Sequence, residues 1–163
     1  MATGSVSALD QDTWQLIATN TTTSGSTSTF SSLSGYKEYL IAYEGVSISA
    51  DGSAKLTFNS STSNYYGGSH LQNISGYVEN SSSGLKVNYS TKRTALNGII
   101  SIKNVNNGAP KIVEGYLILQ SGDDYPTNIK GGWTTTDAIT SITITTATGT
   151  FSAGSMKLYG IAG

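Results

Sequence analysis

The sequence predicts an all-β protein, an antiparallel β-sandwich of roughly eight to ten strands. Runs of alternating apolar and polar residues recur along the chain, separated by Gly, Asn, Ser or Pro. No segment keeps the roughly 3.6-residue period of an amphipathic helix. At 163 residues, the chain is long enough for one domain with a substantial core.

The N-terminal half begins with a segment that does not read as a core strand. Residues 1–12 contain two bulky apolar side chains, Val6 and Leu9, and are expected to form an N-terminal arm that becomes ordered against another subunit. Residues 13–163 are expected to form a single β-sandwich domain. The first strands predicted in it are residues 14–18, with Trp14, Leu16 and Ala18 on one face, and residues 27–33 around Phe30.

The strongest run of the chain is residues 38–48. Its alternation predicts Tyr39, Ile41 and Tyr43 on one face, and Leu40, Ala42, Val46 and Ile48 on the other. A strand that is apolar on both faces is expected in the centre of a sheet. An Asp51-Gly52 turn follows, and then a strand over residues 55–59 with Leu56 and Phe58 inward.

The C-terminal half continues the same pattern. Residues 96–105 and 111–120 predict a hairpin, because Asn107-Gly108 between them accepts the positive φ angles of a tight turn. Because residues 155–161 alternate almost to the terminus, we expect the chain to end inside a sheet. The other predicted strands are residues 64–69, 85–89, 129–133 and 139–145.

The C-terminal segment, residues 149–161, carries the pattern G-x-F-x-x-G-x-x-x-LYGI, formed by Gly149, Phe151, Gly154 and residues 158–161. It resembles the C-terminal strands of a group of small bacteriophage virion proteins. Residues 36–41, YKEYLI, are similar to a strand found early in those proteins. The resemblance implies a jelly roll of two four-stranded sheets, a place in the virus particle and assembly into trimers.

Composition excludes several classes of protein. Ten Asp and Glu balance nine Lys and Arg without a basic cluster, which argues against nucleic-acid binding. Fifteen aromatic residues and a net charge of -1 argue against disorder. The chain has no Cys and shows neither a signal peptide nor an apolar run of membrane-spanning length. We therefore expect a virion protein that is made in the host cytoplasm and does not insert into membranes.

The residues that catalysis requires are sparse. His70 is the one histidine, and no Gly-x-Ser-x-Gly motif accompanies it. Asp123-Asp124 read as turn formers, and Asp10-Gln11-Asp12 lacks the spacing of a calcium loop. We expect no catalytic residues, no metal ligands and no cofactor, and hence a protein that is not an enzyme.

Aromatic residues are the remaining candidates for a site. Tyr65, Tyr66, Tyr125 and Trp133 fall in or beside predicted loops, where exposed rings could contact a partner protein or stack on a glycan. The structural alternative is core packing, with Trp14 and Trp133 capping the two ends of the sandwich.

Together these observations predict a non-enzymatic structural component of a bacteriophage virion. The favoured form is a compact accessory protein, a capsid decoration or cement protein or a head fibre or knob, that contacts other virion proteins. Low surface charge favours a homo-oligomer, a trimer first, because flat faces can meet without burying unpaired ions. The alternative is a tail-fibre or receptor-binding module that recognises host-surface carbohydrate.

Overall fold

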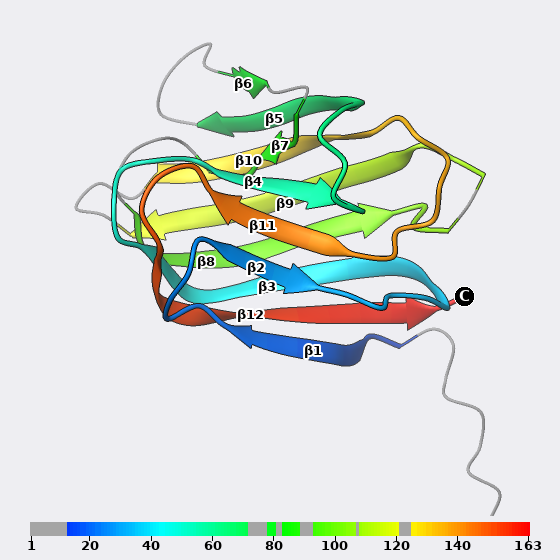
Figure 1. The fold of residues 1–163 in the computed structure, drawn as a ribbon, viewed down its shortest axis with the longest axis horizontal. Coiled ribbons are helices and arrows are strands. Elements are labelled where there is room, and N and C mark those ends of the chain that lie inside the picture. Colours follow the sequence, from blue (N-terminus) through cyan, green and yellow to red (C-terminus); the bar gives the residue numbers. More distant parts are fainter. Residues whose placement is uncertain (1–12, 72–77, 81–82, 89–92, 107, 121–124) are drawn as a thin grey trace, which may run out of the picture.

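The fold consists of strands alone. Figure 1 shows it in a computed structural model, which describes residues 13–71, 78–80, 83–88, 93–106, 108–120 and 125–163. These residues form twelve strands and no helix. Neighbouring strands in both sheets pair antiparallel. The prediction of an all-β antiparallel sandwich is confirmed.

The two sheets of the sandwich are unequal. The larger sheet contains, in order, β1 (Gln15–Thr21), β12 (Phe151–Ala162), β3 (Tyr36–Ile48), β8 (Arg93–Lys103), β9 (Lys111–Gln120), β10 (Tyr125–Trp133), β5 (Tyr65–Leu71) and β6 (Val78–Asn80). The smaller sheet contains, in order, β2 (Thr27–Phe30), β11 (Ile142–Thr146), β4 (Ala54–Phe58) and β7 (Leu85–Lys86). The expected division into two four-stranded sheets is wrong, because the larger sheet continues beyond β8 through four more strands.

One hydrophobic core fills the space between the sheets, which lie face to face (Figure 1). Every second side chain of a strand points into it, as the period of two requires. The inward residues include Tyr39 and Ile41 of β3, Leu56 of β4, Ile144 of β11 and Leu158 of β12. Burial of such side chains is worth about 1.5–3 kcal/mol each and is the main force that holds the two sheets together.

Most predicted strands are found close to their expected bounds. Leu56 and Phe58 point inward from β4, and β8 and β9 form the predicted hairpin. β3 lies inside the larger sheet, between β12 and β8. The sequence did not reveal β6, whose three residues are too few for an alternating pattern.

The predicted facing of β3 is wrong beyond Tyr43. Its pairing with β8 shifts between Tyr43 and Val46, and Gly45 has a φ of 62°. This bulge adds one residue to the strand and reverses the alternation that follows. Val46 and Ile48 therefore enter the same core as Tyr43.

The predicted facing of β1 is also wrong. Its pairing with β12 shifts between Leu16 and Ala18, so that Ile17 and Ala18 pack against the core. Leu16 and Trp14 are exposed instead. Trp14 therefore does not cap the sandwich core.

Lys111 is buried at the start of β9. Its ammonium group donates hydrogen bonds of 2.7 Å to the backbone carbonyls of Asn106 and Ala109. Burial lowers the pKa of Lys111, and the nearby charge of Asp137 partly opposes this. The buried cation ties together the turn between β8 and β9.

The C-terminal strand lies between β1 and β3, so the chain ends inside a sheet as predicted. Met156 and Leu158 are buried, whereas Tyr159 is half-exposed on the opposite face. β11 is not the partner of β12, because it belongs to the smaller sheet.

Candidate functional site

Two of the predicted contact residues belong to the core. Tyr65 and Trp133 are cross-strand partners on β5 and β10, and they are only 6% and 3% exposed. Their rings stack with centroids 6.2 Å apart, and Phe58 packs against both. Core packing is therefore the role of Trp133, and neither ring is presented to a partner.

The polar atoms of these two rings are used inside the fold. The Trp133 indole donates to the carbonyl of Ser63 at 3.2 Å, and the Tyr65 hydroxyl accepts from the backbone N–H of Phe58 at 2.7 Å. Burial raises the pKa of Tyr65 to about 12, although the hydrogen bond with Phe58 opposes the shift. Tyr65 is therefore neutral at physiological pH.

Tyr66 remains a candidate for partner contact, since it points away from the core and is 46% exposed. Its cross-strand partner is Gly132. A Cβ atom at Gly132 would lie 2.6 Å from the Tyr66 hydroxyl oxygen, so glycine leaves the space that the ring occupies. Tyr125 begins β10, but its side chain lies outside the described part of the structure.

The outer face of the larger sheet, the side turned away from the smaller sheet, carries exposed apolar residues. Ile99 of β8 and Tyr116 of β9 are direct cross-strand partners, and they are 49% and 38% exposed. Ile112 and Ile118 of β9 and Leu16 of β1 are also exposed. Ile99, Tyr116 and Ile118 form a cluster on this face beside the ion pair of Lys103 and Glu114, and exposed apolar clusters occur at surfaces that contact another protein.

Sequence reasoning missed this cluster, although β9 contains a signal for it. Val113 and Leu117 point into the core while Ile112, Tyr116 and Ile118 point out. A strand with apolar side chains on both of its faces is expected to be covered on both faces.

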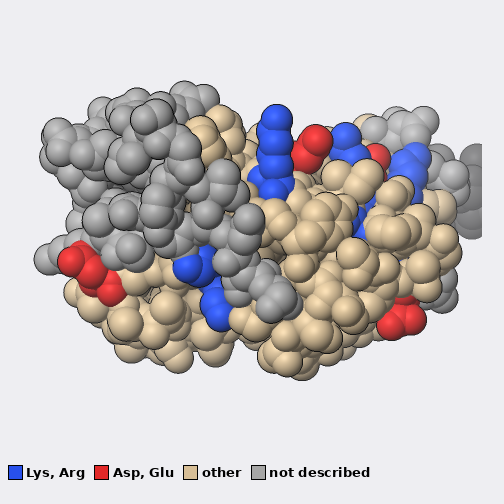
Figure 2. Space-filling model, turned by 90° about the horizontal axis from the view of Figure 1, so that it is seen from above, with Lys and Arg blue, Asp and Glu red and all other residues tan. Residues whose placement is uncertain are grey.

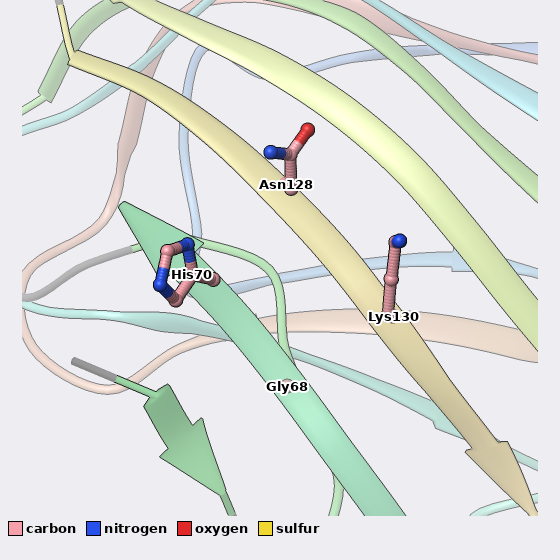
Figure 3. Close-up of a pocket in the computed structure, with 4 residues that line it drawn as sticks. All are labelled: Gly68, His70, Asn128 and Lys130. Atoms are coloured by element: carbon pink, nitrogen blue, oxygen red, sulfur yellow. The ribbon is translucent and has the colours of Figure 1, made fainter. Parts of the chain in front are cut away.

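A pocket of about 270 Å³ also opens in the larger sheet, between β5 and β10. Its described lining residues are Gly68, His70, Asn128 and Lys130 (Figure 3). His70 was expected in a loop, but it lies within β5 and is partly buried. The predicted sites did not include this pocket, because residues of two distant segments form it.

Among the residues that the structure describes, charged side chains do not gather into a further site. They stand singly or in small groups on the side of the molecule in Figure 2. Within the described residues, no three His, Asp or Glu side chains gather as metal ligands would, and no helix is long and apolar enough to span a membrane. Asp10, Asp12, Asp123 and Asp124 lie outside the described residues, as does the predicted arm.

Comparison of the chain with protein-family models, curated proteins and solved structures finds no match.

Proposed function

We propose that this protein is a non-enzymatic structural component of a bacteriophage virion. It acts as a compact accessory protein of the capsid, a decoration or cement protein or a head fibre or knob, that binds other virion proteins. The observation that carries the proposal is the group of exposed apolar residues on the outer face of the larger sheet, Ile99, Tyr116 and Ile118, which lies beside the ion pair of Lys103 and Glu114. An assembly protein needs such a surface, whereas it needs no catalytic group.

The order of the strands supports a jelly roll. In a jelly roll whose strands are numbered 1 to 8, the sheets have the orders 1-8-3-6 and 2-7-4-5. Leaving aside the four strands β9, β10, β5 and β6, the order here is β1-β12-β3-β8 in one sheet and β2-β11-β4-β7 in the other. The chain thus follows the order that the resemblance to phage proteins implies, with two additional strand pairs.

The C-terminal pattern has a physical meaning in this fold. Gly149 and Gly154 have φ angles of 67° and 87°, which suit glycine, and Phe151 is buried. A Cβ atom at Gly160 would lie 2.8 Å from Ile17 Cδ1, so its absence lets β1 pack closely. These features support the likeness to phage proteins that end on the same pattern.

The proposal includes self-association into a trimer through the outer face. Light scattering of the purified protein tests it, with an expected mass close to three times that of the 17.0 kDa chain. A monomer at every attainable concentration would count against this part of the proposal.

Location in the particle requires a separate test. Purified particles of the virus that encodes this chain should contain it, as detected by mass spectrometry. Imaging of those particles should place it on the capsid. Its absence from intact particles would overturn the proposal.

A second candidate function is recognition of host-surface carbohydrate, as in a tail-fibre or receptor-binding module. The exposed ring of Tyr66 favours it, because such rings stack on sugar faces. Tyr66→Ala should abolish binding on a glycan array if this function holds. Trp133→Ala is not a suitable test, because that ring is part of the core.

A further inference from the structure

The pocket between β5 and β10 places three polar side chains on one side of the sheet. Asn128 pairs with His70 across the strands, and Lys130 pairs with Gly68. The residues between them, Ile129 and Ser69, are buried in the core. The pocket therefore opens on the outer face, where Asn128 and Lys130 project from β10 (Figure 3).

Gly68 leaves room for the pocket. A side chain at this position would project on the outer face, opposite Lys130 and two residues from His70. Glycine has no side chain to fill this space, and Gly68 itself is buried. β5 and β10 also belong to the strands that the larger sheet has in addition to the jelly-roll order.

The polar groups of the pocket have unused hydrogen-bonding capacity. Within the described part of the chain, the side chains of His70, Asn128 and Lys130 make no hydrogen bond or ion pair. Glu114 is the cross-strand neighbour of Lys130, but its carboxylate lies 3.9 Å from the Lys103 ammonium. An ammonium, an amide and an imidazole therefore face the pocket, with no carboxylate among its described lining residues.

Two exposed tyrosines flank these groups. Tyr116 is the neighbour of Asn128 on β9, and Tyr66 precedes Gly68 by two residues on the same face. The volume of about 270 Å³ is below the roughly 300–1,000 Å³ of pockets for drug-sized ligands, so the ligand should be small.

We propose that the pocket binds a uronic-acid unit of a glycan. The carboxylate pairs with the Lys130 ammonium, sugar hydroxyls bond to Asn128 and His70, and the ring lies beside the tyrosines. A neutral sugar would leave Lys130 without a partner, and a bare phosphate would not use the tyrosines. The inference rests on the second candidate function; Tyr116 lies both beside the pocket and on the face proposed for subunit contact, so one protomer can use it for one of the two roles at a time.

His70 provides a direct readout, because it is the one histidine of the chain. Its Cε1–H signal in a proton NMR spectrum belongs to this pocket alone. At constant pH, methyl glucuronide should shift this signal in a saturable titration. Methyl glucoside should bind at least roughly tenfold more weakly than methyl glucuronide, since it lacks the charge that Lys130 recognises. Inorganic phosphate should not bind.

Two variants test whether glucuronide binds in this pocket. Lys130→Gln should weaken glucuronide binding by roughly tenfold, and Asn128→Ala should weaken it severalfold. Lys157→Gln removes the same charge from the same sheet on β12, outside the pocket, and it should leave binding unchanged. Thermal unfolding of each variant verifies that the fold is retained.

Several outcomes would overturn the inference. Equal binding of glucuronide and glucoside would remove the role of Lys130, and phosphate binding as tight as glucuronide would show a simple anion site. Absence of glucuronide binding would refute it directly. Glucuronide binding that both pocket variants leave intact would place the sugar site elsewhere and preserve the second candidate function.

Discussion

Two buried polar residues, Lys111 and Tyr65, show how the core accommodates polar groups. Lys111 is fully buried, yet its ammonium donates hydrogen bonds to two backbone carbonyls of the turn. Tyr65 similarly uses its hydroxyl within the core. Burial of these two side chains is tolerated because the Lys111 ammonium and the Tyr65 hydroxyl both have hydrogen-bond partners.

Replacement of Lys111 by methionine should therefore destabilise the fold. The variant keeps most of the side-chain volume but removes both hydrogen bonds of the ammonium, at a cost of about 2–3 kcal/mol. Denaturant unfolding measures the difference. The control is Lys103→Met on neighbouring β8, where the cation is exposed and its ion pair with Glu114 is 3.9 Å long. An equal effect of both variants would contradict the role assigned to the buried ammonium.

Buried tyrosines predict sensitivity to alkali. Burial raises the pKa of Tyr39 and of Tyr65 to about 12 and raises that of Tyr43 still further. Between about pH 10 and pH 12 the unfolded chain releases these protons while the folded chain keeps them, so stability falls as pH rises. Lys111, with its lowered pKa, acts in the opposite sense but is one group against three.

Melting temperatures at pH 8, 10 and 11 check this prediction, with absorbance at 295 nm to follow tyrosinate. The melting temperature should drop across the series, and Tyr65→Phe should reduce the drop. A melting temperature that is constant up to pH 11 would show that these hydroxyls are not protected by the fold.

Single strands show why the C-terminal pattern matters. β12 pairs with β1 on one side and β3 on the other, and it buries Met156 and Leu158. The glycines of the pattern provide positive φ angles and close packing, so the pattern specifies a central strand. The residues of the pattern stabilise the fold and do not line the pocket between β5 and β10.

Leu158→Ala should cost about 2–5 kcal/mol, because a fully buried side chain leaves a cavity between the sheets. The midpoint of urea unfolding measures the change. Ser152→Ala on the same strand is the control, since Ser152 is exposed and its loss should change stability by less than about 0.5 kcal/mol. A small effect at Leu158 would mean that the core collapses around the missing atoms.

The whole molecule presents two different outer surfaces. The larger sheet exposes Ile99, Ile112 and Ile118, whereas the outward residues of β2 in the smaller sheet are Thr27 and Thr29. This difference is the basis for placing the proposed contact between subunits on the larger sheet.

Ile99→Lys should therefore dissociate the proposed trimer, because it puts a charge opposite Tyr116 at the centre of the proposed contact. Light scattering should show a smaller particle with an unchanged melting temperature of the isolated subunit. Thr27→Lys adds the same charge to the smaller sheet and should leave the mass unchanged. Dissociation by Thr27→Lys alone would move the contact to the other sheet.

Local sequence determined much of this fold. Alternation located β3, β4, β8, β9 and β12, and Gly and Asn marked the turns between them, since both signals depend on neighbouring residues. The same alternation identified Leu56, Phe58 and Leu158 as core residues.

Tertiary structure alone decided where the surfaces and the pocket lie. The bulges in β1 and β3 reverse which residues face the core, and no local sequence pattern indicates these bulges. The pocket exists because β5 pairs with β10, which brings His70 beside Asn128. Tyr65 and Trp133 entered the core for the same reason, because pairing between distant strands is set by packing of the whole sandwich.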